Sequence, residues 1–187
     1  MDYNAIDPEI AWTIGPNGAR TELWLVFGSY WSGIKARRLD MKTGHLSTED
    51  TKLYSLASRG GKPIEASSVA YRNGYYYLFV SFDACCQGVK STYRVMVGRS
   101  HHITGPYVDK HGVDMMKGGG TEILASHGNV RGPGGEDVYL DGNVYRMIYH
   151  WYDANENGRA KFDIVDLDWS ADGWPSVGHQ SHLNYKF

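Results

Sequence analysis

The chain has 187 residues, and its 19 lysines and arginines against 21 aspartates and glutamates give a formal net charge of −2. This length fits one domain, spanning residues 1–187, that buries a large core. A near-neutral chain without a basic run argues against nucleic-acid binding, and no apolar stretch approaches the roughly 20 residues that cross a bilayer. The first residues contain no basic and apolar signal segment, so the chain shows no export signal and its localisation stays open.

The apolar residues are unusual in kind, since the chain has 14 Tyr, 6 Trp and 5 Phe beside 23 Gly. Aromatic residues favour strands, and glycine favours tight turns. Together they indicate many short strands, with ring faces left over for a ligand such as a sugar.

Short runs rich in Val, Ile, Tyr, Phe and Trp predict the strands. In chain order the clearest runs are residues 23–27, 69–71, 75–82, 93–97, 138–140, 144–151 and 162–167. Turn signals separate them at residues 16–18, 72–74, 141–143, 155–158 and 172–173. No stretch has the period of a long amphipathic helix, so the sequence predicts an all-β fold.

A repeat of about 60 residues runs through the chain. Its units begin at residues 6–10, 64–69 and 135–138, and each continues through a turn into further strands. The second strands of the three units end at Ser29, Ser81 and His150. Four strands per unit at this period are typical of β-propeller blades. Because three blades do not close a ring, we expect a part of a longer propeller or a chain that completes itself with another chain.

Cys85 and Cys86 are adjacent, so a disulfide between them would close a strained ring. Successive side chains on a strand also point to opposite faces. We therefore expect two small unpaired residues in a buried strand or loop.

Asp7 and Glu65 occupy matching places on the innermost strands of consecutive repeats, each after an isoleucine. The innermost strands line the channel of a propeller, so both carboxylates are expected in one cavity. Paired carboxylates perform glycoside hydrolysis, in which one donates a proton to the leaving oxygen and another activates water. The alternative is that both are ordinary surface acids.

His150 ends a second strand inside the aromatic run at residues 149–153. It is either a hydrogen-bonded core histidine or a channel-facing ligand that holds a metal mostly through water. The chain has no dense ligand cluster of the zinc or EF-hand kind. The glycine runs at 118–120 and 132–135 predict turns rather than phosphate-binding loops.

Several segments in order resemble the endo-α-1,5-L-arabinanases of glycoside hydrolase family 43. They are residues 4–8 (NAIDP), 27–34 (FGSYWSGI), 64–66 (IEA), 76–83 (YYLFVSFD), 91–100 (STYRVMVGRS), 103–107 (ITGPY), 112–116 (GVDMM), 131–135 (RGPGG) and 149–153 (YHWYD). The resemblance covers nearly the whole chain. It implies a five-bladed propeller that cleaves the α-1,5-arabinan backbone of pectin with inversion.

The resemblance also implies roles for single residues. Glu65 matches the general acid, and Asp7 matches the acid that orients it and raises its pKa, because a nearby negative charge disfavours ionisation. The positions that match substrate-contacting segments are Asn4, Ala5, Ile6, Gly28, Ser29 and Tyr30. His150 matches a histidine that binds a calcium or similar ion, largely through water.

The family's general base is an aspartate upstream of the NAIDP motif, and only six residues precede Asp7. The resemblance therefore predicts a chain with the acid half of an inverting site. Open blade faces favour association, so we expect a homo-oligomer or a complex with an N-terminal segment.

Two alternatives remain open on the sequence. One is a propeller fragment that binds arabinan without cleaving it, through aromatics such as Trp31 and Trp151. The other is a different family 43 specificity, such as an arabinofuranosidase or xylosidase.

Overall fold

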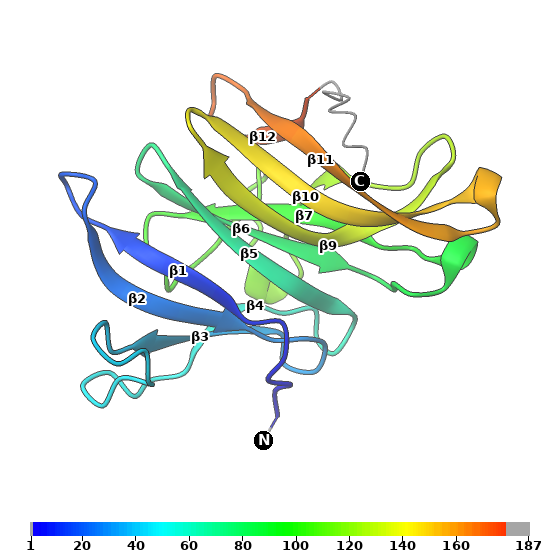
Figure 1. Cartoon of the computed structure of the whole chain (residues 1–187). Helices are drawn as coiled ribbons and strands as arrows, with labels where there is room; N and C mark the ends of the chain where they lie inside the picture. Colours follow the sequence, from blue (N-terminus) through cyan, green and yellow to red (C-terminus); the bar gives the residue numbers. More distant parts are fainter. Residues whose placement is uncertain (1, 179–187) are drawn as a thin grey trace.

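The computed structural model describes residues 2–178, which form three four-stranded antiparallel sheets (Figure 1). The first sheet, blade 1, comprises β1 (Glu9–Ile14), β2 (Arg20–Phe27), β3 (Ile34–Leu39) and β4 (Tyr54–Ala57). Blade 2 comprises β5 (Ile64–Arg72), β6 (Tyr75–Phe82), β7 (Arg94–Ser100) and β8 (Thr121–Leu124). Blade 3 comprises β9 (Val130–Asp141), β10 (Val144–Asp153), β11 (Arg159–Trp169) and β12 (Pro175–Val177).

Three short 3₁₀ helices, η1 (Gly88–Lys90), η2 (Met115–Lys117) and η3 (Ala154–Glu156), lie in the connections. No helix in the described part of the chain is long and apolar enough to cross a membrane.

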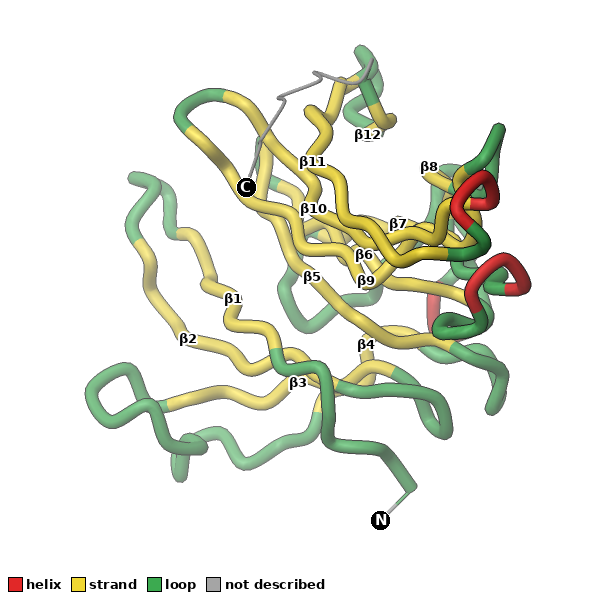
Figure 2. The backbone as a smooth tube through the Cα atoms, turned by 45° about the vertical axis from the view of Figure 1, so that its right-hand side comes forward, coloured by secondary structure: helices red, strands yellow, loops and turns green. Residues whose placement is uncertain are grey.

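In each sheet the strands follow one another in chain order. The first strands of the sheets, β1, β5 and β9, are neighbours in space, as Figures 1 and 2 show from two directions. Sheets of this order, packed side by side around their first strands, are propeller blades. The predicted all-β propeller fold is confirmed for three blades.

Strand β6 explains why the blades pack as they do. Its sequence, YYYLFVSF, does not alternate between apolar and polar residues, because both of its faces are buried. Leu78 and Val80 pack into the core shared with blade 1, and Tyr77 and Phe79 pack into the core shared with blade 3. Blade 2 is therefore the central layer of the described structure.

The hairpin between β5 and β6 has the residues that its turn geometry requires. Between β5 and β6, Asn73 and Gly74 have φ values of 50° and 84°. Left-handed backbone at both positions is the conformation of the tight hairpin turn that Asn-Gly favours. The predicted turn at residues 72–74 is confirmed.

The strand boundaries differ from the sequence prediction in two ways. β5 begins at Ile64 rather than at residue 69, and β9 begins at Val130 rather than at residue 138. The predicted turn at residues 132–135 is therefore wrong, because these residues lie within β9. The fourth strands of the three blades, β4, β8 and β12, were not among the clear runs. They contain only three or four residues each, which is too short for a periodic pattern.

The expectation for the cysteines was wrong. Cys85 and Cys86 are joined by a disulfide in the loop after β6, where Cys86 is exposed. Successive side chains point to opposite faces only in a strand, but here Cys86 has a φ of 67°. This left-handed backbone turns the chain between the two residues, so the alternation of a strand does not apply.

Candidate active site

The predicted site residues gather at one end of the sheets. Glu65 lies at the start of β5 opposite Ser81, which is near the end of β6. His150 lies near the end of β10 opposite Gly134. Asp7 lies just before β1. In Figure 1 the connections after β6 and β10 meet at the right, beside the starts of β5 and β9.

Glu65 is held by two hydroxyl groups. Ser29, from the connection after β2, donates to its Oε2 at 2.6 Å. The Tyr93 hydroxyl donates to its Oε1. Both donors are buried, whereas Glu65 itself is only half-buried. The carboxyl group is thus fixed in place while part of it still reaches solvent.

Asp7 lies directly beside Glu65. Its Oδ2 accepts a hydrogen bond of 3.1 Å from the backbone amide of Ala66, the residue after Glu65. Burial raises the pKa of Asp7, the Ala66 amide lowers it, and the negative charge of Glu65 raises it again. The two carboxyl groups are therefore close enough to interact electrostatically.

The correspondence between the repeats is shifted by one residue from the prediction. A left-handed residue lies near the start of each first strand: Asp7 with φ 55°, Ala66 with φ 52° and, after a first one at Gly132, Gly135 with φ 62°. By backbone conformation Asp7 thus matches Ala66, not Glu65. Successive residues at such a kink can aim at one hollow, so the shift preserves the meeting of the two carboxylates.

Tyr30 and Trp31 both have left-handed backbone, with φ values of 54° and 41°. Large side chains adopt this conformation rarely, and such outliers concentrate at functional sites. Burial and the charge of Glu65 raise the pKa of Tyr30, which places its hydroxyl within electrostatic range of the site. Trp31, the next residue, is 57% exposed.

Tyr93 is a site residue that the sequence reasoning missed. Burial, its hydrogen bond to Glu65, and the charges of Glu65, Glu136 and Asp7 all raise its pKa. Its hydroxyl group is therefore a neutral donor placed among three acids. The resembling segment at residues 91–100 contains Tyr93, but nothing marked it among 14 tyrosines as a donor.

Glu136 is a second acid that was not assigned to the site. It is 4% exposed, and Ser81 donates to its Oε2 at 2.6 Å. Its Oε1 is buried and has no hydrogen-bond partner among residues 2–178. Burial raises the pKa of Glu136 to about 8, the Ser81 hydrogen bond lowers it, and the charge of Asp137 raises it. Such a group is largely protonated at neutral pH.

His150 lies between two tyrosine rings, with ring centroids 5.8 Å from Tyr93 and 5.6 Å from Tyr152. Its Nε2 is buried and accepts or donates no hydrogen bond within the described part of the chain. Burial lowers the pKa of His150, which favours the neutral imidazole that binds metals.

The described residues contain no group of three or more His, Cys, Asp or Glu side chains that could hold a metal. Only the orphaned Nε2 of His150 fits an ion there, and that ion would need water for its remaining ligands. The calcium ion stays a prediction.

The other predicted substrate residues lie close to these acids in the backbone. The Gly28 amide donates to the Ile6 carbonyl at 2.9 Å, and the Tyr30 amide donates to the Ile64 carbonyl at 2.7 Å. These bonds tie the segments before Asp7 and Glu65 to the connection after β2. Asn4 is half-buried and Ala5 is exposed in the segment that leads to Asp7.

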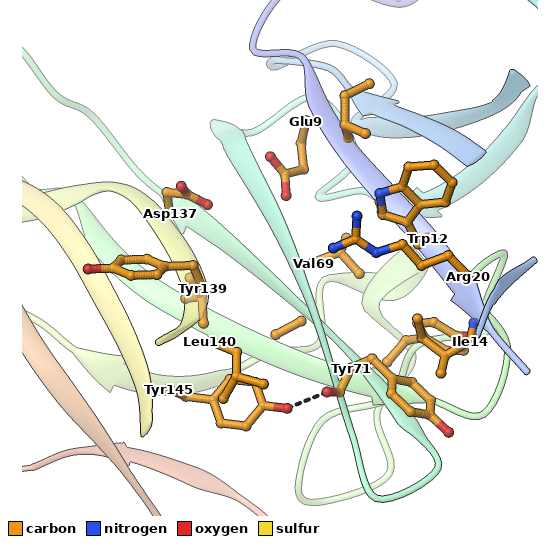
Figure 3. A pocket seen from close by; sticks show the side chains of 15 residues that line it. Glu9, Trp12, Ile14, Arg20, Val69, Tyr71, Asp137, Tyr139, Leu140 and Tyr145 are labelled. Atoms are coloured by element: carbon orange, nitrogen blue, oxygen red, sulfur yellow. Dashed lines mark hydrogen bonds between the residues drawn. The ribbon is translucent and has the colours of Figure 1, made fainter. Parts of the chain in front are cut away.

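A separate hollow lies further along the first strands (Figure 3). Glu9 and Asp137 face it from β1 and β9, with Val69 between them on β5. Burial and the charge of Asp137 raise the pKa of Glu9 to about 7, although backbone amides of Val69 and Ile10 oppose this. The hollow is a second acidic feature of the channel wall.

The fold and the site together define a class of protein. A propeller whose blades bring two acids to one end, with one acid fixed by hydroxyl donors, has the equipment of a carbohydrate-cleaving enzyme. The chain belongs to glycosyl hydrolase family 43, whose family model matches residues 1–175.

Three relatives illustrate the similarity. The chain is 49% identical over 177 residues to the extracellular endo-α-(1→5)-L-arabinanase 1 of Bacillus subtilis (strain 168), covering 94% of this chain and 51% of that protein. The structure of an exo-1,5-α-L-arabinanase from a bovine ruminal metagenomic library matches with a TM-score of 0.86 and 36% identity, over 96% of this chain and 58% of that one. The Cellvibrio cellulosa α-L-arabinanase complexed with arabinohexaose matches with a TM-score of 0.85 and 33% identity, over 95% and 58% of the two chains.

The family predicted from the sequence motifs is confirmed. The chain spans about half the length of the curated relatives it matches.

Proposed function

We propose that this chain is the proton-donating part of a glycoside hydrolase that cleaves internal α-1,5-L-arabinofuranosidic bonds of arabinan with inversion. The observation that carries the proposal is Glu65, fixed by Ser29 and Tyr93 beside Asp7. Further support comes from the names of the relatives, which are arabinanases, one of them in complex with arabinohexaose.

In this proposal Glu65 donates its proton to the leaving glycosidic oxygen. Asp7 orients Glu65 and disfavours the loss of that proton, because two negative charges in one cavity repel each other. An inverting reaction also needs a carboxylate that activates water on the opposite face of the sugar. The proposal assigns that role to no residue of this chain.

The substrate contacts are proposed for the segments around the acids. The backbone of Asn4, Ala5 and Ile6 leads to Asp7, and Gly28, Ser29 and Tyr30 border Glu65. The exposed ring of Trp31 can stack on a sugar face.

The test is the release of reducing sugar from linear arabinan. Glu65→Gln should lower the rate by about 10²-fold or more, because it removes the proton donor. Its affinity for arabinohexaose should change little, since the side chain keeps its shape. Glu22→Gln is a matched control, because Glu22 is bonded to Thr13 within blade 1. Where the unaltered chain releases reducing sugar, an equal rate for Glu65→Gln would refute the role of Glu65.

Two other outcomes identify the alternatives. Binding of arabinohexaose without sugar release by the unaltered chain would indicate a non-catalytic arabinan-binding propeller, which the exposed Trp31 favours. Release of monosaccharide alone would indicate an exo-acting specificity, as in the name of the ruminal relative.

We also propose that a second copy or a further segment of a longer chain covers the hollow of Figure 3. Two of its lining residues are large and apolar yet exposed, Ile10 by 51% and Leu140 by 55%. Covering them removes apolar surface from water. Light scattering checks the first case, and a compact monomer at micromolar concentration would count against a second copy.

The proposed cofactor is a calcium ion or another small cation near His150, held largely through water. Calcium should raise the melting temperature of the chain, and the increase should be absent in His150→Ala. The proposed localisation is extracellular. The disulfide suits an oxidising compartment, and the Bacillus subtilis relative is named as extracellular.

A further inference from the structure

The loop that carries the disulfide is bonded to two tyrosines of the site. The backbone amide of Cys86 donates to the Tyr152 hydroxyl at 3.1 Å. One residue before the disulfide, the carbonyl of Ala84 accepts a 3.1 Å hydrogen bond from the Tyr93 amide. Tyr152 belongs to blade 3 and Tyr93 to blade 2, so the loop connects the two blades at this end.

These two tyrosines are the rings on either side of His150, with ring centroids 5.6 and 5.8 Å away. Tyr93 also donates to Glu65. A chain of contacts therefore runs from the disulfide to the acid that we assign as proton donor.

Close backbone contacts seat the loop on blade 3. A Cβ at Gly132 would lie 2.4 Å from the Cβ of Ser91, and a Cβ at Gly158 would lie 3.0 Å from the Cα of Gly88. Only glycine permits such approaches. Figure 1 shows the loop with η1 beside the β10–β11 connection with η3.

The disulfide determines the direction of the Cys86 amide. A bond between adjacent cysteines closes a small ring through the peptide that joins them, so the backbone of both residues is restricted. Cys86 has a φ of 67°, which non-glycine residues rarely adopt. Once the ring opens, Cys86 is free to relax to a negative φ. Because hydrogen bonds hold the loop at Ala84 and Gln87, this relaxation rotates the Cys85–Cys86 peptide and turns the Cys86 amide away from Tyr152.

We propose that the Cys85–Cys86 disulfide is a positioning element of the site, which holds the Cys86 amide on Tyr152, thereby fixes the Tyr152 ring on His150, and weakens the binding of arabino-oligosaccharides when it is reduced. The statement on binding rests on the proposed function, whereas the statement on His150 does not.

Reduction acts at one place, because the chain has only two cysteines. A water-soluble phosphine breaks the S–S bond and supplies two electrons, while water supplies two protons to the thiols and the oxygen of the phosphine oxide. Cys86 is exposed, so the phosphine can reach it.

The first experiment follows the Cε1–H resonance of His150 by NMR, assigned from its loss in His150→Gln. Phosphine treatment should move this resonance in the unaltered chain by more than its linewidth. It should not move in Tyr152→Phe, which keeps the ring but removes the acceptor of the Cys86 amide. The double variant Cys85→Ser/Cys86→Ser should show the reduced position without phosphine.

Tyr145→Phe is the matched control. Its hydroxyl also donates across the interface of blades 2 and 3, to the Tyr71 carbonyl, but it lies at the other end of the sheets. Phosphine should move the His150 resonance in this variant as in the unaltered chain.

The second experiment measures arabinohexaose binding by calorimetry. Reduction should weaken binding about fivefold, the effect of one lost hydrogen bond in the site. Tyr152→Phe should bind like the reduced chain and should not respond to phosphine.

An unmoved His150 resonance, or an equal movement in Tyr152→Phe, would overturn the proposal. Global unfolding on reduction, visible as lost amide dispersion, would also overturn it, because the disulfide would then serve overall stability. No binding of arabinohexaose by the oxidised chain, together with the expected NMR result, would instead refute the proposed function and leave the positioning role standing.

Discussion

The Ser29 hydroxyl donates to the Glu65 carboxylate at 2.6 Å, across the boundary between blades 1 and 2. The same relationship recurs at the next boundary, where Ser81 of blade 2 donates to Glu136 of blade 3 at 2.6 Å. In each case the preceding blade holds the acid of the following one. The position of each acid therefore depends on contacts between neighbouring blades, and variants at those contacts test the site.

Ser29→Ala should lower arabinan hydrolysis about tenfold, because Glu65 Oε2 loses its donor and the carboxyl group becomes free to turn. Ser32→Ala is the control, since the buried Ser32 hydroxyl has no hydrogen-bond partner in the part of the chain that the structure describes. Initial rates on linear arabinan measure both variants. A Ser29→Ala rate equal to that of Ser32→Ala would contradict the role of this bond.

Tyr93→Phe should lower hydrolysis about tenfold or more, because it removes the second donor to Glu65. Tyr107→Phe is the control for the loss of a buried tyrosine hydroxyl, since Tyr107 donates to the Ile103 carbonyl within the core. Both variants should lose about 1 kcal/mol of stability. Only Tyr93→Phe should lose activity at temperatures where both are folded, as rates and thermal melts together will show.

Glu9→Gln should make the chain more stable at alkaline pH. The pKa of Glu9 is raised from 4.5 to about 7 in the folded state. Between these values the unfolded chain has lost the proton that the folded chain still binds, so stability falls as pH rises. Above pH 7 the free energy of unfolding remains lower by the full amount, up to about 3 kcal/mol. Denaturant melts should show a gain for Glu9→Gln at pH 8 and almost none near pH 4.

Asp137→Asn removes one of the two causes of the raised pKa of Glu9 and leaves Glu9 in place. The charge of Asp137 is the second cause of the raised pKa, after burial. This variant should therefore reduce the pH dependence of stability without abolishing it. A pH dependence identical in the unaltered chain and Glu9→Gln would show that Glu9 does not titrate in this range.

Gly135→Ala should destabilise the chain more than Gly142→Ala. Both glycines have left-handed φ values, 62° and 60°. A Cβ at Gly135 would lie 2.6 Å from Nδ1 of His150, whereas a Cβ at Gly142 would meet nothing within 4 Å. Both should show about 1 kcal/mol of backbone strain, and Gly135→Ala a further 1–3 kcal/mol or so from the clash. Equal melting temperatures would mean that the His150 ring can move aside.

The strands and the repeat could be predicted from the sequence because they depend on local patterns. The run YYYLFVSF and the Asn73-Gly74 turn each predict their conformation without reference to distant residues. Asp7 and Glu65 were found because the repeat and the motifs mark them. The one-residue shift between them could not be predicted, since it depends on left-handed backbone at Asp7 and Ala66, and an alanine gives no sign of that conformation in the sequence.

The site residues that were missed depend on contacts across blades. Tyr93 is a donor only because blade 2 places it on Glu65, and Glu136 is unusual only because its surroundings exclude water. The disulfide was missed for a different reason. Adjacent cysteines were treated as strand residues, whereas the turn at Cys86 brings their sulfurs together.

The burial of β6 on both faces has a consequence for how the protein unfolds. Tyr77 and Phe79 pack into the core shared with blade 3, and Leu78 and Val80 pack into the core shared with blade 1. Unfolding of either outer blade would therefore expose one apolar face of β6 to water. The three sheets should accordingly unfold in one cooperative transition. Removal of any one blade would leave its neighbour with an exposed apolar face.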